Sequence, residues 1–142
     1  MTAMEPLCHL IGINSYELSR KENFFLEAEL FTRICEELKE IFREEHKNYF
    51  RLMKFTVEKE NTMLETYFIQ LIIKDILSTG EYTLEGIANY TNIHEDIIQE
   101  VINGRNTTPS AILLRRIIEL HRSIRRELYL TIMKKITSLQ TS

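Results

Sequence analysis

Apolar side chains recur at spacings of three and four residues through the first half of the chain. This spacing places them on one face of a helix. Ser19 and Glu22 form a capping box, which predicts a helix start near Arg20. The stripe that follows contains Phe24, Ala28, Phe31, Ile34, Cys35, Leu38, Ile41, Phe42, Tyr49, Phe50, Met53 and Val57.

An unbroken helix over this stripe would be about 35 to 40 residues, or roughly 55 Å, long. A helix of that length requires a partner or a bend in a small globular protein. The stripe is wide enough to favour a bundle over a simple coiled coil. A bend near His46 is also open, although neither Pro nor Gly there demands it.

Helix signals continue to the end of the chain. Thr62 and Glu65 form a second capping box for a helix ending near Ser78, before Gly80. Thr83 caps a short helix to about Tyr90, and Asn92 caps another that ends before Gly104. Thr108, followed by Pro109, starts a last helix of residues 109–139. The sequence predicts an all-α fold of six or seven helices, in which only residues 9–13 have an extended pattern.

The composition suits a helical domain, with 44% hydrophobic residues, four Gly and two Pro among 142 residues. No run of about 18 uncharged apolar residues exists, so we expect neither a membrane span nor a membrane partner. The acidic, interrupted N-terminus is unlike a signal peptide, which favours a cytoplasmic location. Cys8 and Cys35 have no metal or disulfide spacing and are expected to be ordinary thiols.

Charge is distributed unevenly between the two ends of the chain. Residues 1–104 hold 10 Lys and Arg against 19 Asp and Glu, a balance of −9. Residues 105–142 hold 8 against 2, a balance of +6. The basic tail is where an anionic partner would bind, although it could equally pack on the acidic remainder of this or a neighbouring chain.

Residues 84–101 have the apolar pattern of two short helices packed across a tight turn. Ile87 and the small Ala88 fall where the first helix faces the second. Asn92 falls at a turn position that needs a positive φ, which Asn tolerates better than most residues. Ile93, Ile98 and Val101 supply the core-facing side of the second helix. These features predict a helix-turn-helix.

The following segment, "VINGRNTTPSAILLRRIIEL", resembles the Cro/repressor-like helix-turn-helix family over about residues 64–122. The resemblance implies a helical bundle with the second helix in the DNA major groove, in a dimeric transcriptional regulator of bacterial or phage type. The chain would then comprise an N-terminal dimerisation segment, a long amphipathic helix or helical hairpin, over residues 1–60. The helix-turn-helix bundle with its basic C-terminal helix would occupy residues 61–142.

The resemblance assigns contacts to individual residues. Side chains of the second helix that would read bases are His94, Glu95, Gln99 and Asn103. Candidates for phosphate contacts are Thr83, Arg105, Asn106, Thr107, Thr108, Arg115, Arg122 and Arg126. Arg115, Arg122 and Arg126 would share one face of the last helix, at spacings of seven and four. The alternative is that these arginines simply lie on a solvated helix face and contact no DNA.

Carboxylates on the second helix favour an alternative function. Glu95, Asp96 and Glu100 would face a polyanion, which is repulsive. In a first turn, Glu95 and Asp96 could simply stabilise their own helix through its dipole. The alternative is therefore a non-enzymatic adaptor or effector-like protein that uses the same fold to bind another protein.

The remaining predictions concern self-association and catalysis. Dimerisation candidates on the long stripe are Phe24, Phe31, Leu38, Phe42 and Tyr49, because their apolar surface needs to be covered. No His has the Glu-x-x-His spacing of bundle metal sites, so we expect no metal or cofactor. His46 and His121 should instead be half-buried and hydrogen-bonded. Scattered Gly and Ser residues form no catalytic motif, so no enzymatic activity is expected.

Overall fold

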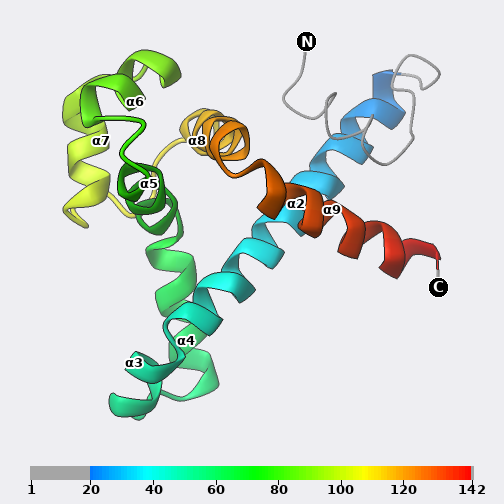
Figure 1. The fold of residues 1–142 in the computed structure, drawn as a ribbon, viewed down its shortest axis with the longest axis horizontal. Helices are drawn as coiled ribbons and strands as arrows, with labels where there is room; N and C mark the ends of the chain where they lie inside the picture. Colours follow the sequence, from blue (N-terminus) through cyan, green and yellow to red (C-terminus); the bar gives the residue numbers. More distant parts are fainter. Residues whose placement is uncertain (1–19, 142) are drawn as a thin grey trace. The chain divides into compact units, whose positions relative to one another are not determined.

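The fold is all-α, as the sequence predicts. The computed structural model describes residues 20–141, and side chains over residues 26–138. The described residues form eight helices and no strand (Figure 1). Three predictions lie outside them: the extended segment at residues 9–13, the thiol of Cys8 and the Ser19 capping box. A helix does begin at Arg20. None of the helices within residues 20–141 combines the length and apolar character of a membrane crossing.

Contacts divide the chain into two compact units. One unit joins residues 1–40 with residues 125–142, and the other comprises residues 41–124. Helix α2 (Arg20–Glu45) therefore contributes to both. The segments expected from the sequence, 1–60 and 61–142, divide the chain elsewhere. We describe each unit by itself.

The first unit contains most of α2 and all of α9 (Arg126–Thr141). An ion pair of 2.8 Å between Lys135 Nζ and Glu37 Oε2 links the two helices, and this hydrogen-bonded carboxylate raises the pKa of Lys135. Cys35 is a free thiol whose pKa burial raises to about 11, which fits the predicted ordinary thiol. Buried apolar residues of the unit are Leu30, Ile34, Leu38, Tyr129, Ile132, Met133 and Ile136.

The long amphipathic stripe does not form one helix. Helix α2 ends at Glu45, and a short α3 (Lys47–Leu52) follows after His46, so the bend is the alternative that the structure contains. The His46 ring bonds the carbonyl of Phe42 through Nδ1 at 2.8 Å. Met53 and Val57, the last two residues of the predicted stripe, are 53% and 67% exposed. The chain leaves the helical path between them.

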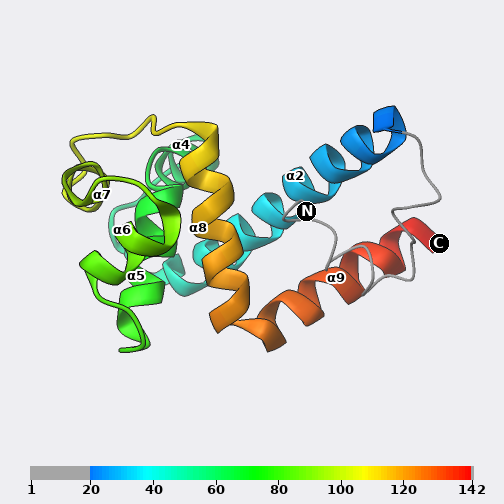
Figure 2. The same ribbon diagram turned by 90° about the horizontal axis from the view of Figure 1, so that it is seen from above.

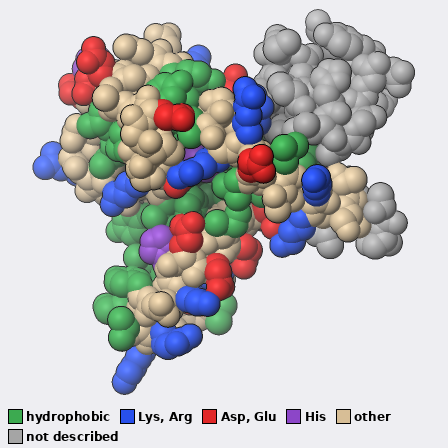
Figure 3. All heavy atoms as spheres, viewed as in Figure 1, with side chains coloured by type: hydrophobic (Ala, Val, Ile, Leu, Met, Phe, Trp, Pro, Cys, Tyr) green, Lys and Arg blue, Asp and Glu red, His purple; other side chains and the backbone are tan. Residues whose placement is uncertain are grey.

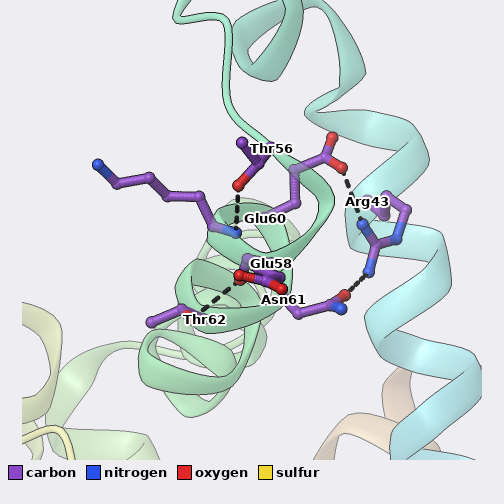
Figure 4. A network of polar contacts seen from close by, with 7 residues as sticks. Arg43, Thr56, Glu58, Glu60, Asn61 and Thr62 are labelled. Atoms are coloured by element: carbon purple, nitrogen blue, oxygen red, sulfur yellow. Dashed lines mark hydrogen bonds and ion pairs between the residues drawn. The ribbon is translucent and has the colours of Figure 1, made fainter.

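Helix α4 (Val57–Thr66) starts earlier than the second capping box predicts. Its N-cap is Thr56, whose hydroxyl accepts from the Lys59 N–H at 3.2 Å. Thr62 lies inside the helix and donates its hydroxyl to the Glu58 carbonyl, so its assignment as a cap was wrong. Arg43 binds Glu60 at 3.2 Å and also Asn61, which fastens the end of α2 to α4 (Figure 4).

Helices α5 (Phe68–Ser78), α6 (Leu84–Thr91), α7 (Glu95–Ile102) and α8 (Ala111–Ile124) form the core of the second unit. Helix α5 contacts α7 and α8, and α6 contacts α7 and α8 (Figure 2). Their shared apolar interior contains Ile72, Ile73, Ile76, Ile87, Ile98, Val101, Leu113, Ile117, Ile118 and Leu120.

A polar pair crosses this interior. His121 is 1% exposed, and its Nε2 lies 2.7 Å from Asp75 Oδ2, which joins α8 to α5. The prediction that His46 and His121 are hydrogen-bonded is confirmed, although His121 is buried more fully than expected.

The predicted last helix is two helices. Helix α8 begins after Ser110, whose hydroxyl accepts from the Leu113 N–H at 3.2 Å, so the cap at Thr108 was wrong. The reason is local, since the Asn106 side chain accepts a hydrogen bond of 3.1 Å from the Thr108 N–H in a turn. The helix then ends at Ile124, where the Ser123 hydroxyl bonds back to the Leu120 carbonyl. Arg125 separates α8 from α9.

Candidate functional site

The α6–α7 pair is built from strong local signals. The Thr83 hydroxyl accepts from the Gly86 N–H at 3.1 Å and caps α6, as predicted. Asn92 ends α6 with φ 54° and ψ 39°, the predicted left-handed turn, and its N–H donates to the Ala88 carbonyl. Its second predicted role was wrong, because the N-cap of α7 is His94.

Helix α7 has one buried face and one exposed face. Ile98 and Val101 are 0% and 2% exposed and pack inward, whereas Ile93 before the helix is half-buried. The four base-reading candidates, with Asp96 and Glu100, are all exposed: His94, Glu95, Gln99 and Asn103. All four predicted side chains are therefore accessible, and their spacing of four places Glu95, Gln99 and Asn103 along one side of α7.

His94 has a specific arrangement at the start of α7. Its Nδ1 accepts from the Asp96 N–H at 3.2 Å and lies 3.6 Å from Asp96 Oδ2. A neutral ring in this arrangement carries its proton on Nε2. Glu95 and Asp96 occupy the first turn, where carboxylates stabilise the helix through its dipole. Their exposure is compatible with both expected roles, contact with a partner and stabilisation of their own helix.

The end of α7 fixes the loop that holds four phosphate candidates. Gly104 adopts φ 75°, and the Arg105 N–H donates to the Glu100 carbonyl at 2.9 Å, which together form a Schellman motif. The Gln70 side chain donates to the Ile102 carbonyl at 2.5 Å and ties this end to α5. Arg105, Thr107 and Thr108 are exposed and Asn106 is half-buried.

The other arginines separate into different environments. Arg115 is exposed on α8, whereas Arg122 is half-buried and its Nε is buried without a hydrogen-bond partner. Arg126 belongs to the other unit, so the predicted continuous face of three arginines was wrong. The break at Arg125 is the physical reason, because helical spacing no longer relates the residues on either side.

Sequence reasoning missed a structural arginine. Arg116 Nη1 donates to the Thr91 carbonyl at 2.6 Å and so binds α8 to the end of α6. A basic residue near a helix C-terminus satisfies an otherwise unpaired carbonyl. The long separation in sequence left no local signal for this contact.

Aromatic and polar groups gather beside α6. Tyr82 and Tyr90 make an edge-to-face contact with ring centroids 6.4 Å apart. Burial is the main cause that raises the pKa of Tyr90, Glu119 and Tyr82 raise it further, and Arg122 lowers it.

A shallow hollow of about 500 Å³ adjoins the α6–α7 turn. Its carboxylates, Glu85 and Glu95, come from both helices. Within the described part of the chain, no three His, Cys, Asp or Glu side chains gather closely enough to hold a metal ion. The lining consists of Glu85, Ala88, Asn89, Asn92, Ile93, His94 and Glu95.

The predicted dimerisation residues are unequal in exposure. Leu38 and Phe42 are 0% and 5% exposed, and the Phe42 ring contacts the Phe68 ring edge-on at 6.2 Å. Phe31 is half-buried and Tyr49 is 46% exposed, while the Phe24 side chain lies outside the described residues. Only part of the proposed stripe is accessible to another chain.

No protein-family model matches this sequence, and no curated protein or solved structure shows significant similarity to it.

Proposed function

We propose that the chain is a DNA-binding transcriptional regulator, in which α6 and α7 form a helix-turn-helix of the Cro/repressor-like type. The observation that carries the proposal is the left-handed turn at Asn92 between two short packed helices. This turn leaves the polar face of α7 exposed, while Ile98 and Val101 on the opposite face are buried in the core. An exposed second helix of this kind can enter a major groove.

Base recognition would come from amide side chains and His94. Gln99 and Asn103 can each pair with the two hydrogen-bonding groups of adenine, and Glu95 can accept from the amino group of cytosine. The Nε2 proton of His94 could donate to a guanine acceptor, since Nδ1 is already engaged.

Affinity would come from the loop after α7 and the exposed end of α8. Arg105 is exposed and its backbone is fixed by Glu100, so the cation is presented from an ordered position. Arg115 adds a second exposed cation from α8. These groups must outweigh repulsion between phosphates and the carboxylates of α7, which predicts modest affinity with a strong salt dependence.

The first experiment is binding of the full chain to random duplex DNA across a salt series. Arg105→Gln should lower the log–log salt slope by about one, because one phosphate contact is lost. Lys74→Gln, which removes an exposed cation on α5, is the matched control and should leave the slope unchanged. Undetectable binding at low salt refutes the proposal.

A second candidate function rests on a separate observation. Ile97 is 40% exposed on α7, and the exposed Glu100 lies three positions further along, on the same side of the helix. An exposed apolar side chain next to a carboxylate fits a basic protein partner better than a phosphate backbone. Ile97→Ser would weaken capture of such a partner, whereas it would leave the salt slope of DNA binding unchanged.

Homodimerisation remains part of the proposal, because two-fold DNA sites require paired reading helices. The contact would have to use apolar surface other than Leu38 and Phe42, which are already buried. Sedimentation of the full chain tests this point, and a strict monomer at working concentration would remove the dimer.

A further inference from the structure

Exposed apolar side chains concentrate at one end of the second unit. We define the α3–α4 tip as residues 47–59, which include α3, the following turn and the start of α4. Four of the eight large apolar side chains exposed within the described residues lie here: Tyr49 (46%), Leu52 (81%), Met53 (53%) and Val57 (67%). The remaining four are spread over α6, α7, α8 and α9, so the clustering is specific to the tip.

Basic residues surround these side chains. The α3–α4 tip holds Lys47, Arg51, Lys54 and Lys59 against Glu58 alone. Lys47 is paired with Glu44, just outside the tip, at 2.7 Å, so the other three Lys and Arg residues supply its positive charge. Arg51 and Lys54 are exposed and make no ion pair among the described residues. Figure 3 shows hydrophobic side chains and Lys or Arg side chains gathered at the end that carries α3 in Figure 1. The surface is both apolar and cationic.

Well-packed residues hold the tip in place. Phe50 is 4% exposed and stacks on Phe55 with centroids 5.9 Å apart. The Phe55 N–H donates to the Phe50 carbonyl at 3.1 Å, and Lys54 adopts φ 56°, so α3 ends in a Schellman motif. Arg43 clamps the other side through Glu60 (Figure 4). The exposed side chains are therefore displayed by ordered structure.

We propose that the α3–α4 tip attaches the protein to the surface of an anionic lipid bilayer. Leu52, Met53 and Val57 would enter the boundary between headgroups and acyl chains, while Arg51 and Lys54 meet lipid phosphates. The expectation of no membrane partner rested on the lack of a spanning segment, and surface attachment requires none. This role is separate from DNA binding by α6 and α7.

Two other occupants fit the tip less well. A second copy docked through the same surface would place like charges opposite each other across a two-fold axis. An acidic helix would fit the adjacent groove of about 330 Å³, which is lined by residues such as His46, Met63 and Tyr67. Leu52, Met53 and Val57 do not line that groove. They protrude beside it, as insertion into a fluid apolar phase requires.

The test is co-sedimentation of the full chain with vesicles of equal parts phosphatidylcholine and phosphatidylglycerol. We expect binding that weakens with salt and is much weaker on phosphatidylcholine alone. Leu52→Ser with Met53→Ser should reduce binding about tenfold or more. Arg51→Gln with Lys54→Gln should reduce it about fivefold per cation. Circular dichroism checks that each variant keeps its helix content.

Matched variants away from the tip distinguish binding through the tip from non-specific binding to vesicles. Ile112→Ser removes a side chain that is 59% exposed on α8, and Lys74→Gln with Lys134→Gln removes two exposed cations. These controls should retain vesicle binding.

Three outcomes would overturn the assignment. The first is no binding to anionic vesicles at low salt, and the second is an equal loss in the control variants. The third is a change in self-association caused by the tip serines without any effect on vesicle binding, which would assign the surface to a second copy.

Discussion

The α6–α7 pair and the α3–α4 tip expose side chains of different chemical character, although both consist of short helices joined by tight turns. The pair buries Ile98 and Val101 and exposes carboxylates and amides. The tip buries Phe50 but exposes Leu52, which is 81% accessible, beside cations. These differences underlie the two proposals, hydrogen-bonded recognition by the pair and attachment of the tip to an anionic bilayer. Apolar side chains are therefore mainly buried in the pair, whereas several are exposed at the tip.

The largest contrast concerns apolar side chains. Ile98→Ala should lower the free energy of unfolding by about 2–5 kcal/mol, because it leaves a cavity at a fully buried position. Leu52→Ala should change that free energy by less than about 0.5 kcal/mol, because Leu52 contributes little to the folded interior. Urea denaturation of the two variants measures both values.

The same pair of variants can break the comparison. A loss above 2 kcal/mol for Leu52→Ala would mean that the tip is part of a packed interface in solution. Repeating the measurement at several protein concentrations identifies self-association as the cause, since only then would the loss vary with concentration.

The sequence predicts the α6–α7 pair well because its determinants are local. Thr83, Asn92 and Gly104 each mark a boundary through a side chain or a backbone preference that operates within a few residues. The tip has no such marker. Helix α3 is followed by Lys54 in a left-handed conformation, where Gly would be expected. The helical spacing therefore continued the apolar stripe through Met53 and Val57, although the structure exposes both.

Candidate site residues follow the same distinction. The exposure of Gln99 and Asn103 could be predicted because it depends only on the face of one helix. The role of Arg116 could not, since it depends on the Thr91 carbonyl of α6, 25 positions away. The grouping of Arg126 with Arg115 also failed, because a single break at Arg125 changes every later position on the helix.

The Schellman motifs allow a second comparison of the two regions. Gly104→Ala should destabilise the protein by about 1 kcal/mol, because alanine is strained at φ 75°. The added Cβ would lie 3.7 Å from Tyr67 Cε1, an ordinary contact, so backbone strain is the only cost. Lys54→Gly should stabilise by up to about 1 kcal/mol, because relief of strain exceeds the added chain entropy.

Thermal and urea unfolding of these two variants should give changes of opposite sign. Destabilisation by Lys54→Gly would show that the lysine side chain contributes contacts that outweigh its strained backbone. Asn106→Ala, in the turn that follows Gly104, is not a substitute control because its side chain also binds the Thr108 N–H.

The smallest effects distinguish a helix cap from a residue inside a helix. Thr83→Ala should destabilise by about 1 kcal/mol, because the Gly86 N–H loses its acceptor. Thr62→Ala should stabilise by a few tenths of a kcal/mol, because Thr62 is exposed within α4 and alanine favours helix more strongly. Thr83→Ser keeps the acceptor and should restore most of the loss. Equal losses of stability in the two alanine variants would instead support a helix start at Thr62. The tip would then extend through residue 61.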